Sequence, residues 1–259
     1  MPEGDAVRRT AARLDAALAG QTLVRADLRV PRFATVDLRG MTVVGTHVHG
    51  KHLLTRMIDE RRALTLHHHL RMDGQWRTGP IGRPGARMHE IRVWLASESV
   101  QALGVRVHDV AVAPTAQEGI WIGHLGLDVL ADDFDADAGA ALLAAADRPL
   151  VEALLDQRLV SGLGTMWAAE LAAAAQVDPR TSTRAVPDLA AALTTIRQRM
   201  AAEVVQRTGR RRGALAVFER AGQPCRVCGT PIRSTRVGVA PYDRPTYWCP
   251  RCQPNPQRS

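Results

Sequence analysis

The chain has 259 residues, of which 34 are basic and 26 acidic, for a formal net charge of +8. This length suits one large or two to three small domains with a real core, and 46% apolar and 23% charged residues exclude wholesale disorder. No run of about 18 apolar residues occurs and the acidic N-terminus lacks an apolar stretch, so we expect neither a membrane span nor a secretory signal, and a cytoplasmic protein.

The first predicted element is a helix over residues 5–19, which Gly20 can end. Its apolar residues recur every three or four positions, and this stripe consists of Val7, Ala11, Leu14 and Leu18. Short β-type runs separated by turn formers follow. They cover residues 22–30, 41–48, 52–58, 63–70, 88–95 and 105–112. Short strands at this spacing predict a two-layer β-sandwich with the first helix packed on it.

Beyond about residue 130 the pattern becomes helical. Helices are predicted over residues 137–146, 149–159, 166–175 and 187–206. The segment Gly162-Leu163-Gly164 interrupts them with a tight turn that glycine permits. A β-hairpin closes the chain. We therefore expect an α+β protein of three domains, at residues 1–130, 131–220 and 221–259.

The positive charge is concentrated in the last quarter of the chain. Residues 197–259 contain 13 arginines and three acidic residues, a net charge of +10, so the first 196 residues carry −2. This distribution favours a polyanionic partner bound by the C-terminal part, with Arg210-Arg211-Arg212 as a phosphate-facing patch. A solvated basic face without a partner is the alternative.

The four cysteines form two Cys-x-x-Cys pairs separated by 20 residues. In a cytoplasmic chain this spacing is typical of a metal site, in which each pair places two thiolates on one turn. Four sulfur ligands leave no open position, so the pattern predicts one structural Zn²⁺ that folds the segment. A redox dithiol is the alternative, and the presence of both pairs disfavours it. The ligands are Cys225, Cys228, Cys249 and Cys252.

Two amines stand out. Removal of Met1 would expose Pro2, whose secondary amine titrates near neutral pH and can condense with a sugar aldehyde, with Glu3 beside it as an acid. The other amine is Lys51, the single lysine among 34 basic residues. A compact ammonium that can lose its proton when desolvated is what arginine cannot replace. A frayed N-terminus and a lysine retained by chance are the alternatives.

Four segments together carry a family resemblance. They are residues 1–5 (Met-Pro-Glu-Gly-Asp), 50–54 (Gly-Lys-His-Leu-Leu), 159–164 (Leu-Val-Ser-Gly-Leu-Gly) and the cysteine segment 225–252 with Arg-Pro-Thr-Tyr-Trp-Cys at 244–249. In this order they resemble the formamidopyrimidine-DNA glycosylase/endonuclease VIII family of base-excision repair enzymes, and most of all its actinobacterial endonuclease VIII branch. The resemblance spans essentially the whole chain. It implies an N-terminal β-sandwich catalytic domain, a helix–two-turns–helix DNA-binding module and a C-terminal zinc finger.

The resemblance also implies site residues. Pro2 would be the nucleophile, Glu3 the general acid and proton shuttle, Lys51 a phosphate ligand needed for strand cleavage, and Arg244 a clamp on the lesion phosphates. Further DNA contacts would come from Arg71, Met72, His124, Gly164 and Thr165. Met72 would be the wedge in the gap left by the flipped base, and Arg71 would contact the orphaned base.

Thr165 replaces the asparagine usual in the family, and the interval between the cysteine pairs is a few residues longer than usual. The run His67-His68-His69 suggests a metal site, but alternation along a strand would put His68 on the opposite face, so we interpret these side chains as packing or phosphate-neighbouring.

The resulting hypothesis is a monomeric, bifunctional DNA glycosylase and AP lyase. It would act on double-stranded DNA that contains oxidised bases, by branch resemblance pyrimidines, or abasic sites. It would lie in the cytoplasm and associate with the nucleoid through DNA. The departures at Thr165 and in the hairpin keep a second hypothesis open, a catalytically silent zinc-finger protein that binds damaged or abasic DNA.

Overall fold

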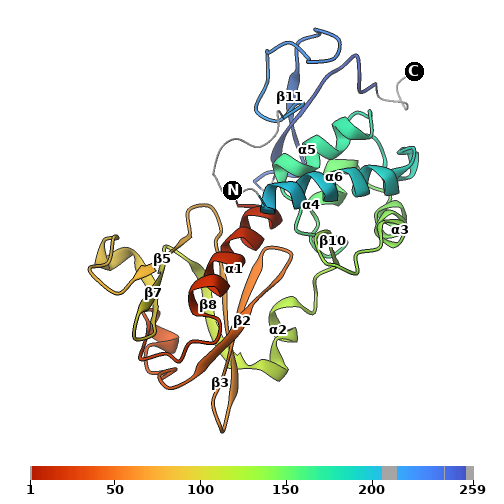
Figure 1. Ribbon diagram of the computed structural model, residues 1–259. Coiled ribbons are helices and arrows are strands. Elements are labelled where there is room, and N and C mark those ends of the chain that lie inside the picture. The colour runs from red at the N-terminus through yellow and green to blue at the C-terminus, as the bar shows by residue number, and fades with distance from the viewer. Residues whose placement is uncertain (1, 206–214, 242, 255–259) are drawn as a thin grey trace. The chain divides into compact units, whose positions relative to one another are not determined.

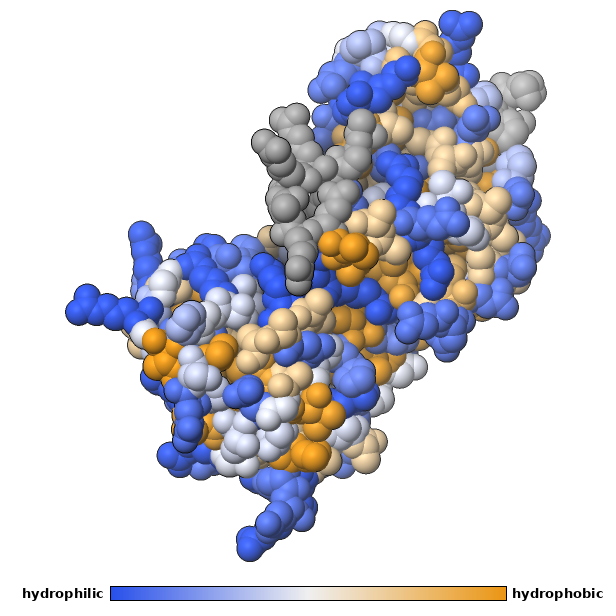
Figure 2. All heavy atoms as spheres, in the orientation of Figure 1, coloured by the Kyte–Doolittle hydropathy of each residue, from blue (hydrophilic) through white to orange (hydrophobic). Residues whose placement is uncertain are grey.

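The computed structural model describes residues 2–205, 215–241 and 243–254 (Figure 1). The chain forms two compact units, Met1–Pro2 with Ala6–His124 and Glu3–Asp5 with Leu125–Ser259. The tripeptide Glu3–Asp5 is thus grouped with the second unit, although Gly4 and Asp5 begin helix α1 (Gly4–Leu18). Within the described residues, no helix is both long and apolar enough to cross a bilayer. On the face shown in Figure 2, hydrophilic side chains predominate and apolar ones are scattered in small groups.

The first unit is built from two four-stranded antiparallel sheets, which confirms the predicted sandwich. One sheet has the order β2-β3-β4-β8 and the other β1-β6-β7-β5. The first comprises β2 (Thr42–His49), β3 (His52–Ile58), β4 (Ala63–His69) and β8 (His108–Pro114). The second comprises β1 (Arg25–Leu28), β5 (Gln75–Pro80), β6 (Ile91–Ala96) and β7 (Val100–Val105). Helix α2 (Gly119–Ile122) follows β8.

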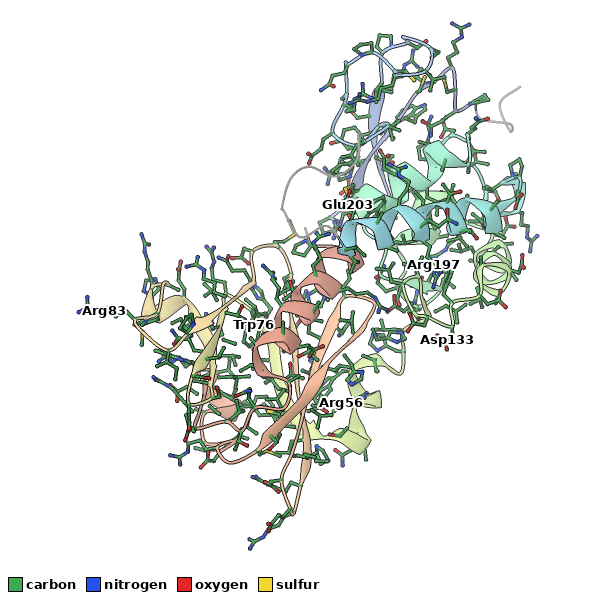
Figure 3. The ribbon with its side chains drawn as sticks, in the orientation of Figure 1. Arg56, Trp76, Arg83, Asp133, Arg197 and Glu203 are labelled. Atoms are coloured by element: carbon green, nitrogen blue, oxygen red, sulfur yellow. The ribbon has the colours of Figure 1, made fainter. Side chains whose placement is uncertain are left out.

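Helix α1 (Gly4–Leu18) contributes the predicted stripe to the core of this unit. Val7, Ala11, Leu14 and Leu18 are all buried. They join one cluster with side chains of both sheets, including Leu53 and Leu66 from one and Val93 and Leu95 from the other. Trp76, labelled in Figure 3, belongs to the same core. Burial of one such Leu or Val contributes about 1.5–3 kcal/mol, so this interface is what holds helix and sheets together.

The predicted strands differ from the structure at several places. Strand β7 was not predicted; it ends at Val105 because Arg106 adopts a left-handed conformation with φ 51°, and the run 105–112 corresponds to β8 from His108 onward. In the run 88–95 the strand begins only at Ile91. Strand β5 was not predicted because it ends in Gly79-Pro80, but it is an edge strand, where proline is tolerated. In the run 22–30 only β1 is a strand, and Thr22 forms an isolated bridge with Thr42.

The second unit is helical and begins with a short parallel pair, β9 (Leu127–Asp128) and β10 (Val160–Ser161). Its helices are α3 (Ala136–Ala146), α4 (Leu150–Leu155), α5 (Thr165–Ala174) and α6 (Leu189–Val205). The predicted helix 149–159 is too long. It ends at Leu155 because Asp156 turns extended and pairs with Arg148 and Arg158, which frees the chain to form β10. The core of the unit surrounds the fully buried Trp167.

The predicted C-terminal hairpin is present as β11 (Arg233–Val237) and β12 (Arg244–Trp248). It packs on the helices of its own unit through a small apolar cluster. Ala169 of α5, Val217, Ile232 and Cys249 form the centre of that cluster. The patch Arg210-Arg211-Arg212 expected from the sequence lies outside the described residues.

Candidate active site and zinc centre

The N-terminal segment is attached to the first turn of α5 by the carboxylate of Glu3. Its Oε2 accepts N–H bonds from Gly164 at 2.9 Å and Trp167 at 3.2 Å, and its Oε1 accepts one from Met166 at 2.9 Å. The side chain is buried, with 3% exposed. A negative group here satisfies helix N–H groups that have no partner within the helix and interacts favourably with the helix dipole. The preceding residue, Pro2, is half-buried.

Gly164 is required by this close approach. A Cβ at that position would lie 2.5 Å from Cδ of Glu3, well inside van der Waals contact. The backbone N–H of Gly164 is donated to Glu3, and the predicted contact of Gly164 with DNA stays a prediction. Gly162 likewise donates its N–H to Oε1 of Gln157, at 3.0 Å. The role of the neighbouring Thr165 in DNA binding stays a prediction.

Lys51 lies at the tip of the hairpin that joins β2 and β3. His49 pairs with His52, so Gly50 and Lys51 form a two-residue connection. Gly50 has φ 59° at the first central position, as a type II′ turn requires. The tight turn gives the lysine stem a fixed starting point at the end of a rigid ladder, which is the placement a positioned cation needs.

A set of neighbouring histidines, His52, His67 and His69, lies on the strands next to Lys51. Nδ1 of His67 lies 3.0 Å from the carbonyl oxygen of Asp109 and therefore carries the proton. Nε2 of the neutral ring then accepts from Nδ1–H of His52, at 2.8 Å. Nδ1 of His69 accepts the N–H of Arg71 at 2.8 Å, so its Nε2 is a donor. The hydrogen bonds thus fix one tautomer for each ring.

These rings are neutral because of burial. Burial lowers the pKa of His52 to about 3, with His67 and His69 adding repulsion. Burial, Arg71 and Lys51 lower the pKa of His69 to about 4. His68 lies on the opposite face, as the alternation predicts, where it accepts from Trp76 Nε1 at 3.2 Å. Complete burial puts the pKa of His68 well below its ordinary value.

The lowered histidine pKa values predict acid sensitivity of the first unit. The unfolded chain protonates these rings near pH 6.5, so their contribution to stability is complete above that pH and is lost as the pH falls toward the folded-state values. For each histidine that stays neutral in the folded protein, the free energy of unfolding falls by about 2 kcal/mol between about pH 7 and pH 5. Calorimetric melting temperatures should fall over this range, and less for His52→Gln. The exposed His89→Gln is the control, and equal slopes for all three proteins would contradict the assignment.

The turn after β4 carries Met72, the predicted wedge, and Arg71, the predicted contact to the orphaned base. Met72 has 70% of its surface exposed, as expected of a wedge. Arg71 has φ 51°, and its Nε donates to Oδ2 of Asp109 at 2.8 Å. Contact of Arg71 with an orphaned base would break this exposed ion pair, which costs about 1 kcal/mol or less. His124 is exposed, with its ring edge-on to His52 at 6.5 Å between centroids.

The four cysteines form one cluster whose ligand atoms all lie within 4.8 Å of one another. Sγ of Cys225 is 3.9 Å from Sγ of Cys252, and Sγ of Cys228 is 3.4 Å from Sγ of Cys249. Four sulfurs at about 2.3 Å from a tetrahedral zinc lie about 3.8 Å apart, so the cluster fits that ion. Backbone N–H groups of Val227 and Cys252 also point at sulfur, which stabilises thiolates.

Arg244 begins β12 and is exposed. Its Nη1 donates to the carbonyl oxygen of Asp243 at 3.0 Å. The Asp243 carboxylate pairs with Arg236, and these hydrogen bonds lower its pKa.

Three family models match consecutive parts of the chain. The formamidopyrimidine-DNA glycosylase N-terminal domain matches residues 1–110, the H2TH domain of the same enzyme residues 125–211, and the zinc finger found in FPG and IleRS residues 222–255. The chain belongs to the formamidopyrimidine-DNA glycosylase family. The predicted resemblance, fold class and zinc finger are thereby confirmed.

Curated relatives in this glycosylase family align over nearly the full length. The "Probable endonuclease 8 2" of Streptomyces coelicolor is 43% identical, covering 99% of this chain and 95% of that protein. The "DNA-(apurinic or apyrimidinic site) lyase Nei2" of Mycolicibacterium smegmatis is 40% identical, covering 98% and 99%. The Lactococcus lactis Fpg (MutM) bound to DNA containing N7-benzyl-Fapy-dG has a TM-score of 0.82 at 23% identity, covering 98% of this chain and 100% of that chain, which shows a shared fold.

Sequence reasoning missed several residues of this glycosylase fold. Glu170 is fully buried, with Arg199 Nη2 at 2.8 Å and the N–H groups of residues 216–218 on its carboxylate. It is the one charged residue in α5, and that isolation was the available signal. Glu118 binds Arg56 through two hydrogen bonds, which tie the segment before α2 to β3 (Figure 3). No sequence pattern connects these two residues.

Proposed function

We propose that this protein is a bifunctional DNA glycosylase and AP lyase that excises oxidised pyrimidines and then cleaves the strand at the resulting abasic site. The observation that carries the proposal is that Pro2, the N-terminal residue once Met1 is removed, is joined to a buried Glu3 carboxylate that is held on the first turn of α5. A binding protein has no need of an N-terminal secondary amine beside a fixed carboxyl group. The names of the full-length relatives, endonuclease 8 and AP lyase, support the same reaction.

The chemistry follows from the residues in order. The damaged nucleotide must leave the base stack, which costs a few kcal/mol. The Pro2 nitrogen forms a bond to C1′ as the bond from C1′ to the base breaks, and Glu3 supplies the proton that the departing group needs. The C1′–O4′ bond of the sugar ring then breaks, O4′ takes up the proton that the Pro2 nitrogen releases, and the iminium ion that remains between this nitrogen and C1′ acidifies C2′. Loss of a C2′ proton expels the 3′ phosphate, and a second elimination expels the 5′ phosphate, leaving a one-nucleotide gap.

The cationic residues act on the phosphates. Lys51 would bind a phosphate beside the lesion, and Arg244 would bind the phosphates that leave, so that charge is neutralised as it develops. A zinc ion held by the four cysteines would keep the hairpin that carries Arg244 folded, and its closed sulfur set leaves no position for substrate. In this scheme residues 1–130 are catalytic, while residues 131–220 and 221–259 bind DNA. The protein acts as a monomer on double-stranded DNA, in the cytoplasm and at the nucleoid.

Cleavage of a small panel of labelled oligonucleotides tests this function. Duplexes that contain an oxidised pyrimidine, an oxidised guanine or an abasic site should be compared with undamaged DNA, each also as a single strand. We expect cleavage at the oxidised pyrimidine and at the abasic site, with phosphate at both ends of the gap. Tight binding of damaged DNA without any cleavage would instead support the catalytically silent binding protein.

Lys51→Arg is expected to slow strand cleavage about tenfold, although the charge is kept, because the larger planar guanidinium cannot replace a compact ammonium on a two-residue turn. Rates of product formation from an abasic duplex measure this. Arg61→Lys, in the turn between β3 and β4 of the same sheet, is the matched control and should cleave normally. A Lys51→Arg variant as fast as the wild type would mean that position 51 needs only charge.

A further inference from the structure

Three consecutive residues at the start of the chain are each bonded to the segment 162–167. The carboxylate of Glu3 accepts N–H bonds from that segment, as described above. The N–H of Gly4 donates to the carbonyl oxygen of Gly162 at 2.9 Å. The carboxylate of Asp5 accepts the indole Nε1–H of Trp167 at 3.1 Å. All of these groups lie in the second unit.

Trp167 holds both ends of this tripeptide. Its backbone N–H donates to Glu3, and its indole donates to Asp5 two residues later. The ring itself cannot shift easily, because it is 2% exposed within the core of the unit. The guanidinium of Arg199 lies over it at 5.6 Å and is in turn fixed by Glu170.

The Asp5–Trp167 hydrogen bond places a carboxylate in the protein core. Asp5 is 0% exposed, and burying a carboxylate is unfavourable unless hydrogen bonds satisfy it. A pair of apolar side chains would give at least equal stability. Unlike an apolar contact, a hydrogen bond has a preferred geometry. The indole donor and the carboxylate acceptor therefore set one position and orientation for the backbone that carries Glu3 and Pro2.

We propose that Asp5 and Trp167 are positioning residues that hold Glu3 and Pro2 in the geometry of the reaction. This proposal rests on the proposed function. Neither residue touches the substrate in this account; they act through the tripeptide to which they are bonded. Misplacement of a reacting group by about 1 Å can cost about 100-fold in rate, so a loss of this one bond has a measurable effect on the chemical step.

Three variants separate positioning from stability. Trp167→Phe keeps an aromatic ring but removes the donor. Asp5→Asn keeps an acceptor oxygen for the indole and serves as the conservative rescue. The double variant Asp5→Val/Trp167→Phe removes both polar groups, and the extra volume of valine offsets the smaller ring. Because the double variant leaves no buried carboxylate facing a missing indole donor, its melting temperature is compared with that of Trp167→Phe.

The measurements are single-turnover excision at saturating enzyme, the affinity for the lesion duplex and the melting temperature. We expect excision about 10- to 100-fold slower in both Trp167→Phe and the double variant, unchanged DNA affinity, and a rate within about threefold of the wild type for Asp5→Asn. If the double variant regains its rate together with its stability, or if no variant is slowed, the pair is only structural. If Trp167→Phe does not fold, the excision rate of the double variant alone distinguishes a positioning role from a structural one. A wild type that excises nothing would overturn the proposed function itself.

Discussion

Glu3→Gln is expected to slow excision of an oxidised pyrimidine by about 10²- to 10⁴-fold, the usual contribution of a positioned general acid. The amide cannot deliver the proton that the departing group needs. The carboxylate accepts hydrogen bonds from three backbone N–H groups at the first turn of α5. The amide of glutamine has an NH₂ group in place of one acceptor oxygen, so at least one of these three bonds is lost. Single-turnover excision at saturating enzyme measures the chemical step apart from DNA binding.

A matched control distinguishes lost chemistry from lost stability. Asp178→Asn also replaces a buried carboxylate, one that binds Arg180 at 2.5 Å, at a position without a proposed role in the reaction. We expect this variant to melt at a lower temperature yet excise at nearly the wild-type rate. A Glu3→Gln variant that excises as fast as Asp178→Asn would show that Glu3 does no more than attach the N-terminus to α5.

Removal of zinc is expected to unfold the C-terminal hairpin and to weaken binding of lesion DNA by more than about tenfold. Structural zinc sites contribute about 10–16 kcal/mol of apparent binding free energy, which exceeds what a small hairpin gains from its own core. Cys249 is buried against Val217 and Ile232, so loss of the ion also disrupts the apolar cluster through which the hairpin packs on α5. Arg244 then loses its fixed position.

Metal analysis together with fluorescence anisotropy on a lesion duplex tests this. The wild type should contain one zinc per chain, and Cys249→Ser should contain less and bind DNA weakly. Ser234→Ala, on the exposed side of the same hairpin, is the control and should keep both zinc and affinity. Full affinity in a zinc-free protein would refute the structural role of the ion.

Local patterns in the sequence were enough for much of the fold. The stripe of α1, the strand 52–58 and the paired Cys-x-x-Cys motifs depend on spacing alone, and each is found where it was expected. The break before α5 followed in the same way from Gly162 and Gly164. These features need no knowledge of what lies beside them in space.

Features that depend on distant residues could not be predicted in this way. Arg106 ends a strand in a left-handed conformation that few arginines adopt, and β5 exists only because β7 pairs with it. The resemblance implies a DNA contact at Gly164, and no local pattern links this residue to the start of the chain. Only the structure shows that the N–H of Gly164 is donated to Glu3, which is 161 residues away in the sequence.

Trapping of the reaction intermediate tests the central claim most directly. The chain contains one lysine. Once Met1 is removed, the protein therefore has two amines that can form an iminium ion or imine, the N-terminal nitrogen of Pro2 and Nζ of Lys51. Borohydride should reduce the iminium formed with abasic DNA to a stable covalent adduct, and trypsin digestion should place the DNA on residues 2–8. An adduct on residues 40–56, which contain Lys51, or no adduct from protein that cleaves the DNA, would contradict the assignment of Pro2 as the nucleophile.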